Sequence, residues 1–112
     1  EKAIDSIKQQ TYRNWELLIC DDSSSDSTVS VIRNFSDSRI RFYQNELNLG
    51  YLRTVNFLLE KVNGSFITFL DADDWSHHER LEKQLEQFTN DPALGICGTW
   101  AQYYNENGTT PT

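Results

Sequence analysis

An apolar run that ends in a cluster of carboxylates constrains this chain more than any other stretch. Residues 65–70 read Ser-Phe-Ile-Thr-Phe-Leu after an Asn-Gly turn signal, which predicts a buried strand. Asp71, Asp73 and Asp74 follow directly, just ahead of a predicted helix. Folding alone gives no reason to gather like charges, whereas a divalent cation takes oxygen ligands and offsets their repulsion. The pattern therefore predicts a metal site at a strand end.

The same cluster also has a purely structural interpretation. Acidic residues are common ahead of helices, where they cap free N–H groups and suit the positive end of the helix dipole. Here Ser76 and Glu79 have the spacing of a capping box. We therefore expect Ser76 to cap the helix, which leaves the aspartates available for a ligand.

Helical and strand patterns alternate along the chain. Apolar spacing predicts helices over residues 2–10 and around 29–32, 52–62 and 81–88, and strands over 15–20, 39–43, 65–70 and 94–104. Such alternation is typical of an α/β domain with a mostly parallel sheet. Ligands bind outside the carboxyl ends of the strands in such sheets. Because Asp21 and Asp22 follow the first predicted strand, we expect both acidic groups at one edge of the sheet.

Length and charge narrow the class of partner. The chain has 112 residues, enough for one small domain, and a formal charge of −7. That charge argues against a nucleic-acid backbone or an anionic membrane surface as partner. It permits a phosphorylated small molecule if a metal bridges the acidic site to the anion. No apolar run reaches membrane-spanning length, and no signal peptide opens the chain.

The cysteines suggest a reducing compartment. Cys20 and Cys97 each lie inside an apolar run and lack metal-site spacing, so we interpret them as buried thiols rather than a disulfide. A cytoplasmic location is the resulting expectation.

Several segments, in order, resemble family 2 glycosyltransferases. Gln10-Thr11-Tyr12 resembles the family's Q-T-Y, and residues 18–28 (LICDDSSSDST) are similar to its V-D-D-G-S-T-D-x-T. Residues 48–50 (NLG) match its N-x-G segment, and residues 64–74 (GSFITFLDADD) look like its G-E-Y-I-x-F-L-D-A-D-D. Residues 79–84 (ERLEKQ) resemble the start of its next helix. The resemblance covers nearly the whole chain, which we treat as one domain over residues 1–112.

The resemblance implies a GT-A fold, with a Rossmann-like half that binds the nucleotide sugar. Such enzymes transfer a sugar from a nucleoside diphosphate donor to an acceptor with inversion at the anomeric carbon. The resemblance implies Mn²⁺ or Mg²⁺ as cofactor, a UDP-sugar as the favoured donor, and a saccharide or lipid-linked acceptor in the parent protein. It also allows a peripheral position on the inner face of the membrane.

The resemblance also assigns roles to individual residues. Asp22 would accept a hydrogen bond from the nucleotide base, which suits an acceptor-only carboxylate. Asp71 would lie near the ribose and the metal, and Asp73 would bind the metal that holds both phosphates. Asp21 and Arg53 complete the expected donor site, although an exposed helical arginine is the simpler interpretation of Arg53.

Departures from the family pattern limit what this chain is expected to do. The family's first strand would precede Glu1, and the general base would lie downstream of the chain's end. We therefore expect a donor-binding fragment that lacks the catalytic base and the first, central strand. Ser23 stands where the family usually has glycine. His77 and His78 flank the acidic cluster, but adjacent helical histidines point in different directions, so at most one would face a metal.

Two other interpretations remain open from the sequence. Residues 18–23 (LICDDS) also resemble the opening of a response-regulator receiver domain, in which Asp71 would be the phospho-acceptor. Against it, a helix precedes this strand, and neither the expected Met-Pro nor a late strand-end lysine is present. The other interpretation is a non-catalytic module that binds nucleotide sugars.

Overall fold

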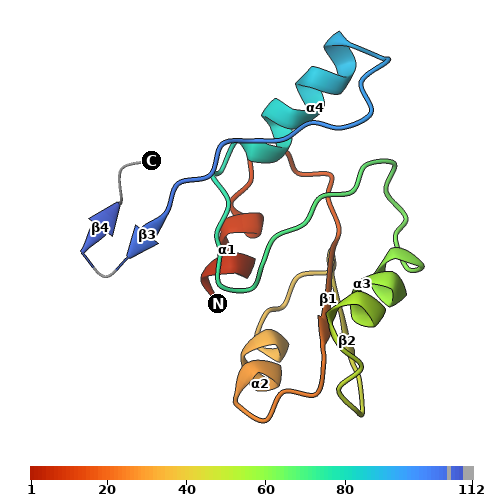
Figure 1. Cartoon of the computed structure of the whole chain (residues 1–112), viewed down its shortest axis with the longest axis vertical. Helices are drawn as coiled ribbons and strands as arrows, with labels where there is room; N and C mark the ends of the chain where they lie inside the picture. Colours follow the sequence, from red (N-terminus) through yellow and green to blue (C-terminus); the bar gives the residue numbers. More distant parts are fainter. Residues whose placement is uncertain (106, 110–112) are drawn as a thin grey trace.

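The computed structural model describes residues 1–105 and 107–109 as a mixed α/β chain with a small parallel sheet flanked by helices (Figure 1). Its elements are α1 (Lys2–Lys8), β1 (Leu17–Asp21), α2 (Thr28–Arg33), β2 (Ile40–Gln44), α3 (Tyr51–Leu59), α4 (Arg80–Asn90), β3 (Tyr104–Asn105) and β4 (Gly108–Thr109). The predicted order of helices and strands is confirmed as far as α4, with one exception between α3 and α4.

The parallel sheet consists of β1 and β2, which the crossover helix α2 connects. The register runs from Leu17 opposite Ile40 to Asp21 opposite Gln44. Helix α3 packs against β1, and the ring of Phe57 meets Tyr43 of β2 edge-on at 5.3 Å between centroids. Both strands therefore end beside the loop that leads into α3, which fixes the place of Asp21 and Asp22.

The buried apolar side chains come from the helices. Ile4 and Ile7 of α1 and Ile32 of α2 are each less than one-tenth exposed. Their spacing on α1 is that of one helical face, as the sequence predicts. The ammonium group of Lys8 lies 5.4 Å from the ring centroid of Phe35, which brings the ends of α1 and α2 together. These contacts hold α1 and α2 together next to the segment that leads into β1.

The predicted strand over residues 65–70 is wrong for this structure. These residues form no strand among the described part of the chain, and Phe66, Ile67 and Phe69 are 56%, 51% and 57% exposed. In Figure 1 the segment between α3 and α4 is a plain trace. The physical reason is pairing: a strand needs a neighbour for its backbone groups, and the described sheet contains only β1 and β2.

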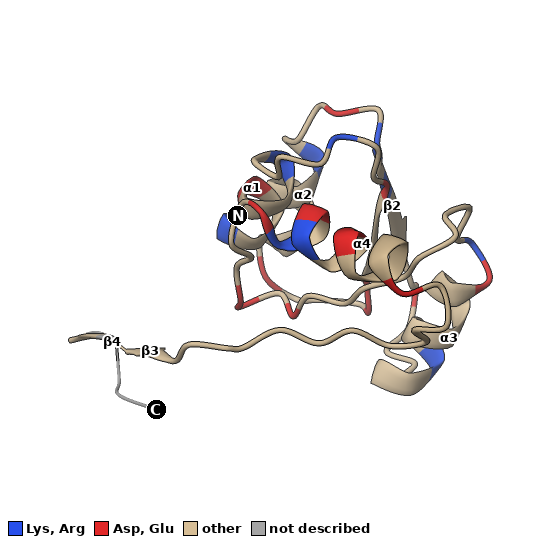
Figure 2. Ribbon diagram, turned by 90° about the horizontal axis from the view of Figure 1, so that it is seen from above, with Lys and Arg blue, Asp and Glu red and all other residues tan. Residues whose placement is uncertain are grey.

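The predicted strand over residues 94–104 is also wrong for most of its length. Only Tyr104 and Asn105 are in a strand, β3, which pairs antiparallel with β4. Residues 92–104 contain no charged residue. They return alongside α4, where the Gln84 side chain donates to the Cys97 carbonyl at 2.8 Å, and then run to β3 as a tan trace in Figure 2. Like residues 65–70, this tract has a strand's composition but no neighbouring strand within the described residues.

The predicted capping box at α4 is also wrong. Glu79 occupies the N-cap position, and no side chain caps the helix in the Ser76–Glu79 manner. Ser76 is instead buried, and its amide donates to the hydroxyl of Ser6 at 3.0 Å. The local spacing predicts a cap, but Ser76 is instead held by a hydrogen bond to Ser6, 70 residues earlier in the sequence.

Candidate functional site

The loop after β1 is built on Asp21. Its side chain is only 5% exposed, and its carboxylate accepts from the backbone amide of Ser24 at 3.0 Å and from the Ser24 hydroxyl. Between them, Ser23 has φ +65°, in the left-handed region that favours glycine. This conformation explains why a glycine suits the position in the resembling family. The loop turns sharply here and leaves Asp22 directed toward α3.

Asp22 joins β1 to the start of α3. Its Oδ1 accepts from the side-chain amide of Asn45 at 2.9 Å and the backbone amide of Leu49 at 2.8 Å, and its Oδ2 accepts from the amide of Gly50 at 2.8 Å. Gly50 has φ +85° and is the N-cap of α3. The carboxylate thus satisfies amides at the N-terminus of a helix, where negative charge is favoured.

These donors keep Asp22 ionised. The Asn45 side-chain amide, with the Leu49 and Gly50 backbone amides, lowers the pKa of Asp22 from its usual value of 3.8. The Thr54 hydroxyl also donates to this carboxylate and lowers the same pKa, so protein donors occupy most of the roughly four lone-pair positions of Asp22. A carboxylate only accepts hydrogen bonds, so a ligand group that contacts Asp22 must be a donor. The sequence did not point to Asn45, whose amide also donates to Thr54 Oγ1 at 3.1 Å.

The acidic turn, residues 71–74, is open to solvent. Asp71, Asp73 and Asp74 are all exposed, and the amide of Asp74 donates to the carbonyl of Asp71 at 3.1 Å. Among the described residues their carboxylates have no protein donor or cation as partner. Because residues 65–70 are not in the sheet, the expected arrangement of both acidic groups on one sheet edge is not formed in this structure.

The three carboxylates also do not converge as a ready-made metal centre. Among the described residues, the group whose possible ligand atoms lie within 4.8 Å of one another is His77, His78 and Glu79. The two histidine rings lie tilted at 4.3 Å between centroids, so the expectation that they diverge is wrong. They precede α4, and helical geometry therefore does not apply to them.

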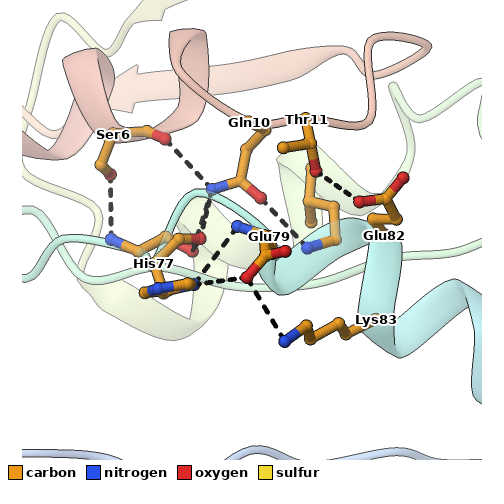
Figure 3. A network of polar contacts seen from close by, with 9 residues as sticks. Ser6, Gln10, Thr11, His77, Glu79, Glu82 and Lys83 are labelled. Carbon is orange, nitrogen blue, oxygen red and sulfur yellow. Dashed lines mark hydrogen bonds and ion pairs between the residues drawn. The ribbon is translucent and has the colours of Figure 1, made fainter.

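Protein contacts already use part of that group. Nδ1 of His77 accepts from the backbone amide of Glu79 at 3.3 Å, and the Glu79 carboxylate pairs with Lys83 at 3.3 Å (Figure 3). The Lys83 ammonium lowers the pKa of Glu79. We therefore interpret these residues as the polar start of α4 rather than as metal ligands.

Arg53 lies on the first turn of α3, three residues after Gly50, whose amide donates to Asp22. Its side chain is exposed and has no partner among the described residues. A long, free cation one turn from the loop can reach an anionic group placed there. No described helix is long and apolar enough to cross a bilayer.

Comparison with known proteins places the chain in a family. Residues 1–112 match the family described as Glycosyl transferase family 2. The chain is 47% identical over 98 residues to the Escherichia coli UDP-Glc:alpha-D-GlcNAc-diphosphoundecaprenol beta-1,3-glucosyltransferase WfgD, covering 88% of this chain and 39% of that protein. It is 33% identical to WfaP of the same species, a protein with the same named activity, covering 93% of this chain and 40% of the relative.

A further relative comes from another bacterium. The Bacillus subtilis protein TuaG, whose name assigns it to teichuronic acid biosynthesis, is 36% identical, with 77% of this chain and 35% of TuaG covered. The chain thus spans well under half the length of these relatives. The match over the whole chain also favours this family over the receiver-domain interpretation. The chain belongs to glycosyl transferase family 2.

Proposed function

We propose that this chain forms the donor-binding part of an inverting hexosyltransferase that uses a nucleoside diphosphate sugar, a UDP-sugar in particular. The observation that carries the proposal is the contrast between its two acidic groups. Asp22 is fixed by protein donors, whereas the carboxylates of Asp71 and Asp73 have none among the described residues. One group suits recognition of a base by hydrogen bonding, and the other suits a cation.

In the donor site, the nucleoside would bind to the loop after β1 and the loop that leads into α3. Asp22 would accept a hydrogen bond from the base, and Asp21 would support it by fixing Ser24 and the loop. Arg53 would attract the phosphates from the first turn of α3. The named UDP-glucose donors and lipid-diphosphate acceptors of WfgD and WfaP support a UDP-sugar and a lipid-linked saccharide acceptor for the intact protein.

Exposed carboxylates without protein donors fit a hard divalent cation, which prefers oxygen ligands. Asp73, with Asp71, would hold Mn²⁺ or Mg²⁺. The bound cation would neutralise negative charge that develops on the departing diphosphate. The chain's own contribution is to place these carboxylates on the short turn between residues 70 and 75.

The finer fold assignment, a GT-A domain, belongs to the same proposal. We infer that residues 65–70 become a sheet strand when a neighbouring strand is available, which brings the acidic turn to the sheet edge beside Asp22. The more than half-exposed Phe66, Ile67 and Phe69 side chains support this inference, because exposed apolar segments with a strand's composition are stabilised when a partner covers them. The general base would lie outside this chain, so the chain alone would bind donor without transferring sugar.

Calorimetry on the intact protein tests the proposal with UDP, GDP and dTDP, each in Mn²⁺ and in EDTA. We expect UDP to bind most tightly and only weakly without the metal. Asp73→Ala should abolish the metal dependence, whereas Asp74→Ala, the same charge change in the same turn, should retain it. Binding of no nucleotide by a folded sample, or equal effects of the two substitutions, would contradict the proposal.

A further inference from the structure

Gln10 is a fully buried polar residue at the centre of a network that connects distant segments. Its side chain has 0% exposure. Its amide Nε2 donates to the carbonyls of Ser6 at 3.1 Å and His77 at 2.7 Å, and its Oε1 accepts from the backbone amide of Leu81 at 3.1 Å (Figure 3). The last two partners lie 67 and 71 residues further along the chain.

The amide is therefore satisfied both by its own helix, through Ser6, and by a distant segment, where Nε2 also lies 3.4 Å from the Ser76 hydroxyl. A buried amide is costly unless its donors and acceptor are satisfied, so this arrangement strongly favours one relative position of the segments. The acceptor satisfies an amide in the first turn of α4, which has no partner within the helix. Gln10 thus joins the end of α1 to both residue 77 and the start of α4.

Neighbouring contacts reinforce the same junction. The amide of Ser76 donates to Ser6 Oγ at 3.0 Å, and the amide of Thr11 donates to the carbonyl of His78 at 2.8 Å. Residues 76–78, which are separated from the acidic turn only by Trp75, are therefore fixed to α1 and to the residues after α1. The exit of the acidic turn has a rigid attachment even though the turn itself is exposed.

The entrance of the acidic turn is attached to the same helix. The guanidinium of Arg80, the first residue of α4, donates to the Thr68 hydroxyl at 2.9 Å and to the Phe69 carbonyl at 3.3 Å. The start of α4 therefore contacts the chain on both sides of residues 71–74. Gln10 connects the start of α4 to α1. The segments before and after the acidic turn are therefore both held by contacts that depend on Gln10 or on the start of α4.

We propose that Gln10 is a positioning residue for the acidic turn: by anchoring residue 77 and the start of α4, it fixes the place at which Asp71 and Asp73 meet a metal-bound diphosphate. This inference rests on the proposed function. It differs from a simple stabilising role because it predicts an effect on the metal side of the donor site and none on the nucleoside side, where Asp22 is fixed by Asn45 and the α3 loop.

The test compares Gln10→Met with Gln9→Met in the intact protein. Methionine keeps the length of glutamine but removes its donors and acceptor, and Gln9 is an exposed neighbour that receives the same substitution. The measured quantity is the ratio of the UDP dissociation constant in EDTA to that in Mn²⁺. We expect this ratio to fall about tenfold in Gln10→Met, the lower end of the effect of losing an outer partner of a metal site. The dissociation constant in EDTA, and both values in Gln9→Met, should stay unchanged.

A loss of affinity in EDTA equal to that in Mn²⁺ would overturn the inference, because it would show a general loss of structure. An unchanged ratio in folded Gln10→Met would overturn it as well. If Gln10→Met does not fold, Ser6→Ala removes the bond to the Ser76 amide, together with a bond to the Ala3 carbonyl inside α1, and should lower the ratio in the same direction. An unchanged ratio there would then overturn the inference.

A second measurement separates this inference from the proposed function. Amide hydrogen exchange of Asp74, whose N–H donates to the Asp71 carbonyl, reports the order of the acidic turn without any ligand. Protection of this amide should fall in Gln10→Met and not in Gln9→Met. If the wild-type protein shows no metal-dependent UDP binding, the proposed function fails, and this comparison still decides whether Gln10 positions the turn.

Discussion

Replacing Ser23 with glycine should stabilise the protein, although the substitution removes a side chain. Ser23 is the described non-glycine residue with positive φ, at +65°. An L-residue in this region is about 1–2 kcal/mol less favourable than in a right-handed conformation. Glycine has no such penalty but loses more conformational freedom on folding, by roughly 0.5–1 kcal/mol. The difference favours glycine by about 0.5–1 kcal/mol.

The serine hydroxyl contributes little that would offset this gain. Its contact is with the Glu46 carbonyl at 3.5 Å, at the limit of a hydrogen bond, and the side chain is exposed. With about 2.1 cal/mol/K per residue, the 112 residues give an unfolding entropy near 0.24 kcal/mol/K. Ser23→Gly should therefore raise Tm by about 2–4 °C.

Differential scanning calorimetry measures the shift, and Ser25→Gly is the matched control. Ser25 is exposed in the same loop, makes no side-chain hydrogen bond among the described residues, and does not have positive φ. The same substitution there should lower Tm, because it only increases the freedom of the unfolded chain. A lower Tm for Ser23→Gly, or shifts of the same sign at both positions, would refute the argument from backbone conformation.

Two further predictions concern the core and the Asp22 loop. Ile7→Ala should lower the free energy of unfolding by about 2–4 kcal/mol, measured by urea titration, because Ile7 is one of the few buried apolar side chains; an effect below 1 kcal/mol would contradict this. The pKa of Asp22 is lowered on folding, so its contribution to stability is present above the unfolded value of 3.8 and is lost as the pH falls through the lower folded value. Asp22→Asn should therefore lose stability at neutral pH and show a weaker acid dependence below about pH 4, whereas an unchanged acid dependence would argue against these bonds.

Local patterns predicted the elements whose partners are close in sequence. The strands over residues 15–20 and 39–43 were expected within two residues of β1 and β2, and the helix stripes match α1 to α4. The apolar spacing of these segments reflects a face that a sequence neighbour covers, as Phe57 of α3 covers Tyr43 of β2. For such elements, the segment that covers the apolar face lies nearby in the same sequence, so the apolar spacing predicts the structure correctly.

Residues 65–70 and 94–104 show the opposite situation. Their composition favours strands, yet strand formation depends on a neighbour that the pattern itself does not supply. The roles of Ser76 and Gln10 were also missed, since each is determined by a partner about 70 residues away. The Gln10-Thr11-Tyr12 motif indicated the family but gave no sign that the glutamine amide is a buried junction.

The two acidic groups differ in what they demand of a ligand. Asp22 already receives donors from Asn45, Leu49 and Gly50, so its position is established before any ligand binds. Asp71 and Asp73 have no such donors, and their mutual repulsion is relieved only by water or by a cation. In the proposed donor site a nucleoside would therefore bind to a preformed loop, whereas the metal and diphosphate would have to complete the order of the acidic turn. The cost of ordering would then fall on binding of the diphosphate half of the donor, and attachments at both ends of the turn would reduce that cost.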